Sequence, residues 1–185
     1  MPERTIVLGS GNAAKREQLR WLLEGLPLVA LQPASIAVDE TAEDLEGNAR
    51  LKALAHSARG LAIASDGGLE LPGAAGRWDP VLTQRMGQAG LRRVVSGIEK
   101  RTARWREAAA IADRGRLLVS WTESGTEGVL APEPWPEPGD FWVWDIFVFP
   151  DLGKRWAHLT PAERLQVDVT WSRLKEHVRA FFANR

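Results

Sequence analysis

The chain has 185 residues, of which 44% are hydrophobic and 26% charged, with 24 Lys+Arg against 24 Asp+Glu and no cysteine. This composition is that of a globular protein, and it excludes general disorder, a disulfide framework and a site built on thiolates. A formal net charge of zero argues against DNA or RNA binding through an extended basic surface. A small phosphate ligand, however, needs only a local positive pocket.

The sequence gives no sign of a membrane segment or a targeting segment. No apolar run approaches the ~18 residues that a membrane helix needs, and residues 1–5 lack the layout of a signal peptide. We therefore expect a cytoplasmic protein with no membrane and no nucleic-acid partner. The three histidines are too few for a His-rich centre, so any metal is expected on carboxylates.

In chain order, strand and helix patterns alternate through the first half. Apolar runs predict strands at 5–9, 28–31 and 61–64, and helical spacing predicts helices at 13–24, 41–59 and 82–99. The second half adds expected strands at 103–112, 117–122, 128–130 and 141–149. A capping box at 160–163 opens a helix that runs towards Phe182. This interspersed order predicts an α/β fold with a mixed sheet.

The first candidate site is the turn between the first strand and the first helix. It contains Ser10 and Asn12, and Lys15 follows one helical turn later. Backbone N–H groups at the start of a helix attract anions, small residues let a phosphate approach, and a lysine adds a point charge. The spacing is not that of a Walker P-loop. An ordinary strand–helix turn capped by Asn12 remains the alternative.

The second candidate site is the acidic segment that opens the second expected helix. Asp44, Asn48 and Lys52 fall on one helix face at i, i+4 spacing, and Glu40 precedes them. A carboxylate and an ammonium there could serve a metal and a phosphate. The alternative is a solvated acidic helix start that favours the helix dipole.

The third candidate is Asp66, which follows the apolar run 61–64 in the stretch Ser65-Asp66-Gly67-Gly68. A carboxylate at the end of a strand projects into the crevice where open α/β sheets bind ligands. At a strand end it would support no core. The alternative is a plain Asp-Gly turn.

The fourth candidate is the aromatic stretch that contains Trp142, Trp144 and Asp145. An aromatic ring can stack on a nucleobase while a neighbouring acid holds a polar edge. The alternative is a strand of the hydrophobic core.

Taken together and in this order, these segments resemble the inosine triphosphate pyrophosphatase family. The family pattern T-G-N-x-x-K corresponds to Ser10-Gly11-Asn12-Ala13-Ala14-Lys15. Further counterparts of family motifs lie, in order, at 40–53, 65–69, 83–85, 142–146 and 153–159. The likeness spans nearly the whole chain.

The resemblance implies a two-lobed, elongated α/β fold with a mixed central sheet flanked by helices. Residues 1–185 would form a single domain of two lobes around one cleft. The implied activity is Mg²⁺-dependent hydrolysis of a nucleoside triphosphate to the monophosphate and pyrophosphate. The implied assembly is a homodimer, with Arg85 and its helical neighbours as candidate interface residues.

The resemblance also implies roles for individual side chains. Asp66 and Lys52 would be catalytic, and Glu40 and Asp66 would bind the metal. The substrate would be bound by Ser10, Asn12, Lys15, Asn48, Trp142, Trp144 and Asp145.

Two departures from the family pattern affect the functional prediction. Ser65 stands where the family has the first of two acids, and the family's S-H-R, which holds the purine edge, falls on 168–170. The sequence therefore does not name the base or the sugar. The alternative function is a non-catalytic nucleotide-binding paralogue. An enzyme for another phosphorylated substrate and a plain structural domain are further alternatives.

Overall fold

A computed structural model describes residues 4–32, 36–138 and 142–184 of the chain. The chain divides into two compact units. Unit 1 comprises Met1–Asp66, Glu107–Glu123 and Trp171–Arg185, and unit 2 comprises Gly67–Arg106 and Ser124–Thr170. Three strands and the last helix contribute residues to both units.

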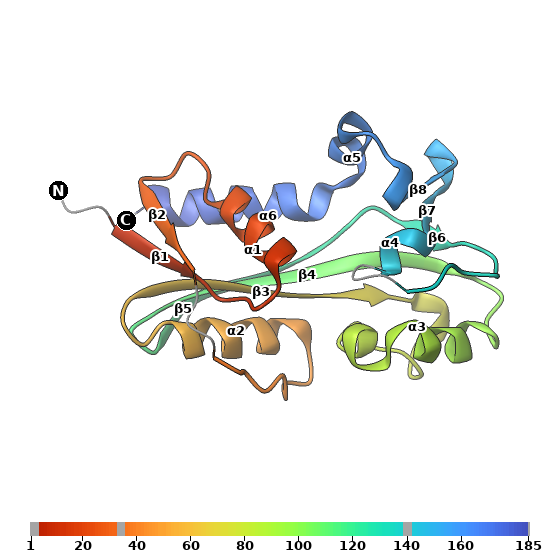
Figure 1. Cartoon of the computed structure of the whole chain (residues 1–185), viewed down its shortest axis with the longest axis horizontal. Coiled ribbons are helices and arrows are strands. Elements are labelled where there is room, and N and C mark those ends of the chain that lie inside the picture. The colour runs from red at the N-terminus through yellow and green to blue at the C-terminus, as the bar shows by residue number, and fades with distance from the viewer. Residues whose placement is uncertain (1–3, 33–35, 139–141, 185) are drawn as a thin grey trace. The chain divides into compact units, whose positions relative to one another are not determined.

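Unit 1 is a sheet covered by helices on both faces. Its elements, whole or in part, are β1 (Arg4–Leu8), α1 (Ala13–Leu22), β2 (Leu28–Leu31), α2 (Leu45–His56), β3 (Leu61–Glu70), β4 (Thr102–Asp113), β5 (Arg116–Ser124) and α6 (Val169–Ala183). Strand β1 pairs in parallel with both β2 and β3. Helices α1 and α6 lie on one side of these strands and α2 on the other (Figure 1). The core between α1, α6 and the strands includes Ile6, Leu19, Ile63 and Leu174, all with no exposed surface.

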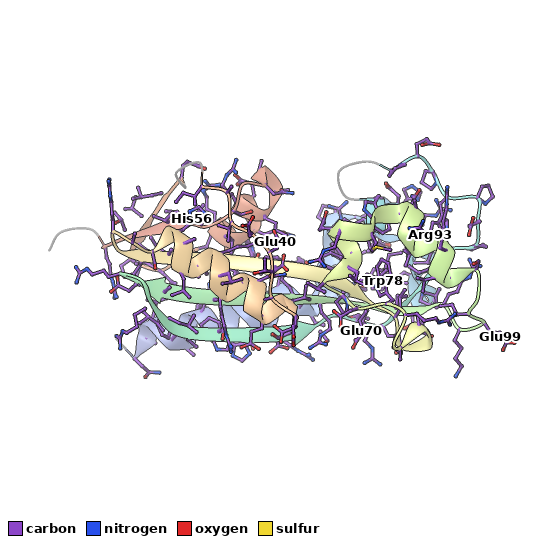
Figure 2. All side chains as sticks on the ribbon, turned by 90° about the horizontal axis from the view of Figure 1, so that it is seen from below. Glu40, His56, Glu70, Trp78, Arg93 and Glu99 are labelled. Carbon is purple, nitrogen blue, oxygen red and sulfur yellow. The ribbon has the colours of Figure 1, made fainter. Side chains whose placement is uncertain are left out.

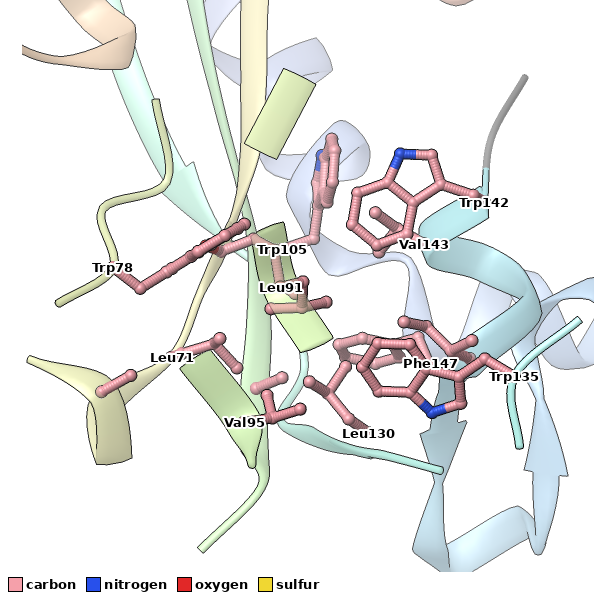
Figure 3. Close-up of a cluster of buried hydrophobic side chains, with 14 of the residues drawn as sticks. Leu71, Trp78, Leu91, Val95, Trp105, Leu130, Trp135, Trp142, Val143 and Phe147 are labelled. Carbon is pink, nitrogen blue, oxygen red and sulfur yellow. The ribbon is translucent and has the colours of Figure 1, made fainter. Parts of the chain in front are cut away.

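Unit 2 adds antiparallel pairing and an aromatic core. Its remaining elements are η1 (Pro72–Ala74), α3 (Leu82–Val95), β6 (Gly128–Leu130), α4 (Trp142–Ile146), β7 (Phe147–Phe149), η2 (Pro150–Leu152), β8 (Lys154–Arg155), η3 (Trp156–His158) and α5 (Pro161–Val167). The pairs β4–β6, β6–β7 and β7–β8 are antiparallel. Figure 3 shows Trp142 of α4, Trp105 of β4 and Leu91 of α3 in one buried cluster.

The strand order, read through hydrogen-bonded neighbours, is β2-β1-β3-β4-β6-β7-β8, with β5 paired to β4. Parallel and antiparallel pairs therefore occur in one sheet, and helices flank it. The predicted α/β class with a mixed central sheet is confirmed. The arrangement of two lobes around one cleft stays a prediction. Among the described residues, no helix combines the length and the apolar character needed to cross a membrane.

One expected turn is in fact the middle of a strand. β3 continues through Ser65-Asp66-Gly67-Gly68 to Glu70, and all of its residues from 61 to 69 are buried. The glycine pair does not end the strand. Gly68 instead allows the backbone of Pro80 to approach closely, because a Cβ at Gly68 would lie 2.0 Å from the Pro80 oxygen. Asp66 is therefore inside a strand, and the prediction that it lies at a strand end is wrong.

Two other boundaries differ from the sequence prediction. The strand expected at 141–149 is a short helix, α4, followed by β7, while Phe141 lies outside the described residues. Trp142, Val143 and Ile146 are buried, and one helical turn places that spacing on one face. The helix expected from 160 towards Phe182 is divided into α5 and α6 at Asp168.

Candidate active site

The turn between β1 and α1 is held by its own side chains. Asn12 is the N-cap of α1, and its Oδ1 accepts a hydrogen bond from the Lys15 backbone N–H at 3.1 Å. The Ser10 Oγ accepts from the Asn12 N–H at 3.2 Å. These bonds fix the first turn of α1, so the position of Lys15 is set by the turn that precedes it. The Ser10 hydroxyl proton and the Asn12 side-chain NH₂ are not used in these two bonds.

Asp66 lies at the centre of a buried polar cluster in unit 1. Its Oδ1 is 2.8 Å from the Nζ of Lys52 and 3.7 Å from the Nζ of Lys15. Its Oδ2 accepts a hydrogen bond from the Asn48 side-chain NH₂ at 3.2 Å. Only 4% of Asp66 is exposed. The strand β3 and the helices α1 and α2 thus bring four predicted site residues together.

Glu40 joins this cluster through Lys52. Its Oε1 is 2.7 Å from the Lys52 Nζ, and Figure 2 shows Glu40 beside α2. Asn48 ties the preceding segment to α2, because its Oδ1 accepts from the Ala42 N–H at 3.1 Å. Burial alone would lower the pKa of Lys52, but the charges and hydrogen bonds of Asp66 and Glu40 outweigh it and raise that pKa. Lys52 therefore carries its positive charge at neutral pH.

Glu107 of β4 is a member of the cluster that the sequence analysis did not single out. Its side chain is 1% exposed, and its Oε1 lies 3.7 Å from the Lys15 Nζ. The sequence does carry a signal for it. Glu107 is an acid directly before the run Ala108-Ala109-Ala110-Ile111-Ala112, and a charged residue inside a buried strand calls for a partner.

The charges of the cluster alternate along one chain of contacts. Glu40 contacts Lys52, Lys52 contacts Asp66, Asp66 contacts Lys15, and Lys15 contacts Glu107. Three carboxylates and two ammonium groups give a formal charge of −1. Such a site has ammonium groups to offer to phosphate oxygens and carboxylates to offer to a cation or a water proton.

The carboxylates of the cluster suit a metal ion that is bound together with a substrate phosphate better than a metal ion that is bound by the protein alone. Among the described residues, no group of three or more His, Cys, Asp or Glu is placed to hold a metal by itself. Glu40 and Asp66, however, both contact the Lys52 nitrogen, at 2.7 and 2.8 Å, so these two carboxylates lie close together on either side of the Lys52 ammonium. Mg²⁺ is commonly bound by one or two carboxylates together with substrate phosphates.

The predicted base-contacting residues lie in unit 2. Trp142 is buried in the aromatic core, and Trp144 packs with its ring centroid 4.8 Å from those of both Trp105 and Trp156. Asp145 is half-buried in α4. These contacts account for the tryptophans as core residues. A contact with a nucleobase stays a prediction for all three residues.

The fold and the cluster together define an α/β protein with a lysine- and carboxylate-lined site next to a strand–helix turn. The sequence profile of the Ham1 family matches residues 6–172. The chain therefore belongs to the Ham1 family, and the resemblance to inosine triphosphate pyrophosphatases is confirmed.

Two relatives by sequence have the same description. The "dITP/XTP pyrophosphatase" of Prochlorococcus marinus (strain MIT 9313) is 33% identical over 175 residues, which cover 90% of this chain and 85% of the relative. The "dITP/XTP pyrophosphatase" of Gloeobacter violaceus (strain ATCC 29082 / PCC 7421) is 34% identical over 170 residues, covering 87% of this chain and 86% of the relative.

Solved structures agree with the fold. The HAM1 protein from Coxiella burnetii superposes with a TM-score of 0.78 at 23% identity, covering 98% of this chain and 100% of its own. The nucleoside-triphosphatase / dITP/XTP pyrophosphatase from Mycobacterium abscessus superposes with a TM-score of 0.64 at 26% identity, covering 98% of this chain and 97% of its own.

Proposed function

We propose that the protein hydrolyses a nucleoside triphosphate to the monophosphate and pyrophosphate. The observation that carries the proposal is the buried cluster in which Lys15 and Lys52 meet Asp66 at 3.7 and 2.8 Å. Two ammonium groups beside one carboxylate suit a reaction in which phosphate charge is held while a proton is removed from water. Relatives described as dITP/XTP pyrophosphatases make dITP and XTP the first substrates to test.

In the proposed reaction, a water oxygen forms a bond to the α-phosphorus. The bond from that phosphorus to the bridging oxygen breaks, and pyrophosphate leaves. Asp66 accepts the proton of the attacking water, Lys52 fixes the carboxylate of Asp66, and Lys15 holds phosphate oxygens. Asn48 fixes the second oxygen of Asp66 by its hydrogen bond. Ser10 and Asn12 donate their unused protons to the phosphates.

Glu40 and Asp66 are the residues that would hold a divalent cation, and we propose Mg²⁺. When bound, such a cation neutralises phosphate charge and orients phosphate oxygens. For the base, we propose that Trp142 and Trp144 provide the aromatic contact and Asp145 a polar one. We also propose that the protein acts as a homodimer.

The test is a panel of dITP, XTP, ITP, GTP and ATP, each assayed for pyrophosphate with and without Mg²⁺. We expect pyrophosphate, not inorganic phosphate, and more of it from dITP and XTP than from GTP and ATP. Lys52→Met should abolish the release, whereas Lys100→Met, which removes an exposed lysine, should not. Nucleotide binding without any pyrophosphate release would instead support the non-catalytic paralogue.

A further inference from the structure

We propose that Glu107 is a positioning residue for phosphate binding. Its buried carboxylate holds the Lys15 ammonium beside Asp66, so that Lys15 meets the phosphate chain in a fixed place. The inference rests on the proposed function, because it assigns Lys15 to the triphosphate. It adds a residue from β4 to a polar cluster otherwise made by α1, β3, α2 and the segment before α2.

The two lysines of the cluster are held in different ways. Lys52 lies 2.7 and 2.8 Å from its two carboxylates, which is the distance of charge-assisted hydrogen bonds. Lys15 lies 3.7 Å from Asp66 and 3.7 Å from Glu107, beyond that distance. Lys15 is therefore held between two negative charges without being hydrogen-bonded to either. A phosphate oxygen can become the direct acceptor of its protons without displacing a close partner.

Because Glu107 is buried, its negative charge acts strongly on the Lys15 ammonium. The side chains of Glu107 and Lys15 are 1% and 10% exposed, so their attraction is weakly screened by water. Without Glu107, the ion pair that remains for Lys15 among the residues that the structure describes is the one with Asp66. We expect the ammonium then to move onto Asp66, where it would compete with Lys52 and withdraw from the phosphates. Glu107 thus keeps Lys15, which binds phosphate, from pairing closely with Asp66, which accepts the proton of the attacking water.

The test compares Glu107→Gln, which keeps the shape and removes the charge, with Glu107→Asp, which keeps the charge. Glu127→Gln is the matched control, because Glu127 is an exposed acid whose partner is Arg104. The first readout is the ¹⁵N resonance of each lysine Nζ, which is tractable because the chain has only five lysines. Glu107→Gln should shift the Lys15 resonance more than the Lys52 resonance.

The second readout is the affinity for inorganic triphosphate in the presence of Mg²⁺, measured by calorimetry. Glu107→Gln should weaken it about tenfold, equivalent to ~1.4 kcal/mol, and Glu107→Asp should restore most of that loss. With substrate, KM should rise in Glu107→Gln while kcat changes by less than about threefold.

An unshifted Lys15 resonance, or a triphosphate affinity equal to that of the unsubstituted protein, would overturn the inference. An equal loss of triphosphate affinity in the Asp and Gln variants would overturn the inference as well, because the loss would then come from altered packing and not from the removed charge. Should Glu107→Gln fail to fold, Glu107→Met, which also removes the charge and keeps a side chain of similar length, decides through the same two readouts. If no nucleotide yields pyrophosphate, the proposed function fails, whereas the resonance and the triphosphate affinity still test Glu107.

Discussion

Asp66 shows how one buried carboxylate can be shared. Its Oδ1 faces both lysines and its Oδ2 accepts from Asn48, so each oxygen has an assigned partner. From the sequence we expected an acid with no core to support. The structure instead places it at 4% exposure inside β3, and its charge lies beside the ammonium groups of Lys15 and Lys52. Removal of that charge must therefore affect stability as well as activity.

We predict that Asp66→Asn lowers pyrophosphate release by a factor on the order of 10²–10⁴, the usual contribution of a general base. The same change should reduce the free energy of unfolding by about 1–3 kcal/mol, because Lys52 loses a charged hydrogen-bond acceptor and Lys15 loses a neighbouring negative charge. Steady-state kinetics and urea denaturation measure the two effects. Asp151→Asn, at an exposed position, is the control. Full turnover in Asp66→Asn would remove Asp66 from the mechanism.

At the residue scale, most of the cluster could be predicted from the sequence. Lys15 and Asp66 lie after apolar runs, and Asn48 and Lys52 share a helix face, so local patterns identified them. For Glu107 the local pattern indicates only a buried acid that needs a partner, and it does not indicate which partner. Its role depends on which strand lies next to β3, and that neighbour is brought there by pairing between segments far apart in the chain.

At the scale of elements, β3 depends on Gly68. The backbone of Pro80 approaches this strand so closely that an added Cβ would lie 2.0 Å from the Pro80 oxygen and 2.6 Å from its carbonyl carbon. Pro80 also accepts a hydrogen bond from Thr83 Oγ1, which in turn accepts from the Leu69 N–H at 2.8 Å. The start of α3 is therefore attached to β3 immediately after Asp66 and Gly67.

We predict that Gly68→Ala reduces the free energy of unfolding by about 1–3 kcal/mol, the range for overpacking a rigid contact. The contact is with backbone atoms, which cannot rotate away as a side chain would. Urea denaturation measures the change. Gly11→Ala is the control for stability, since nothing lies within 4 Å of a Cβ at Gly11. Equal stability of the two variants would show that β3 and Pro80 can separate without loss.

The start of α5 offers a test by pH. Thr160 and Glu163 form a capping box, and the Lys154 Nζ lies 2.6 Å from the Glu163 Oε1. The hydrogen bond from Lys154, followed by those from the Thr160 backbone and hydroxyl, lowers the pKa of Glu163 from 4.5 to about 2. A lowered pKa in the folded state means that the ionised form stabilises the fold.

We predict that Glu163→Gln is less stable than the unsubstituted protein at pH 7. The stabilisation by Glu163 is complete above its ordinary pKa of 4.5 and is lost as the pH falls towards about 2. The gap between the two proteins in denaturation midpoints should therefore narrow through that window. Glu137→Gln, at an exposed acid, should show a smaller gap at pH 7. A gap that stays constant down to pH 2 would contradict the capping role of the charge.

The elements themselves were predicted unequally, for a physical reason. β2 and β6 were predicted with the bounds that the structure has, and the capping box at Thr160 is present. These depend on local sequence. α4 was missed because Trp142, Val143 and Ile146 are apolar in either conformation. These three residues pack into the aromatic core of unit 2, a long-range contact that a local pattern does not contain.

At the scale of the whole molecule, the chain supplies each unit with its own core. The core of unit 1 is mostly aliphatic, with Trp171 of α6 among its buried members. The core of unit 2 includes Trp78, Trp105, Trp135 and Trp142. The polar cluster from Glu40 to Glu107 lies in unit 1. Substitutions in unit 1 can therefore test the proposed phosphate binding while leaving the aromatic core of unit 2 unchanged.

The predicted homodimer concerns the exposed side of α3 in unit 2. Arg85 is exposed, and its neighbour Met86 is 38% exposed although it is a large apolar residue. Exposed apolar side chains next to arginine are typical of protein interfaces. We predict a dimer at micromolar concentration and its dissociation in Met86→Glu, measured by light scattering coupled to size exclusion. Leu165→Glu is the matched control, because Leu165 of α5 is 72% exposed. A monomeric unsubstituted protein would contradict the dimer, and dissociation by Leu165→Glu alone would move the interface from α3 to α5.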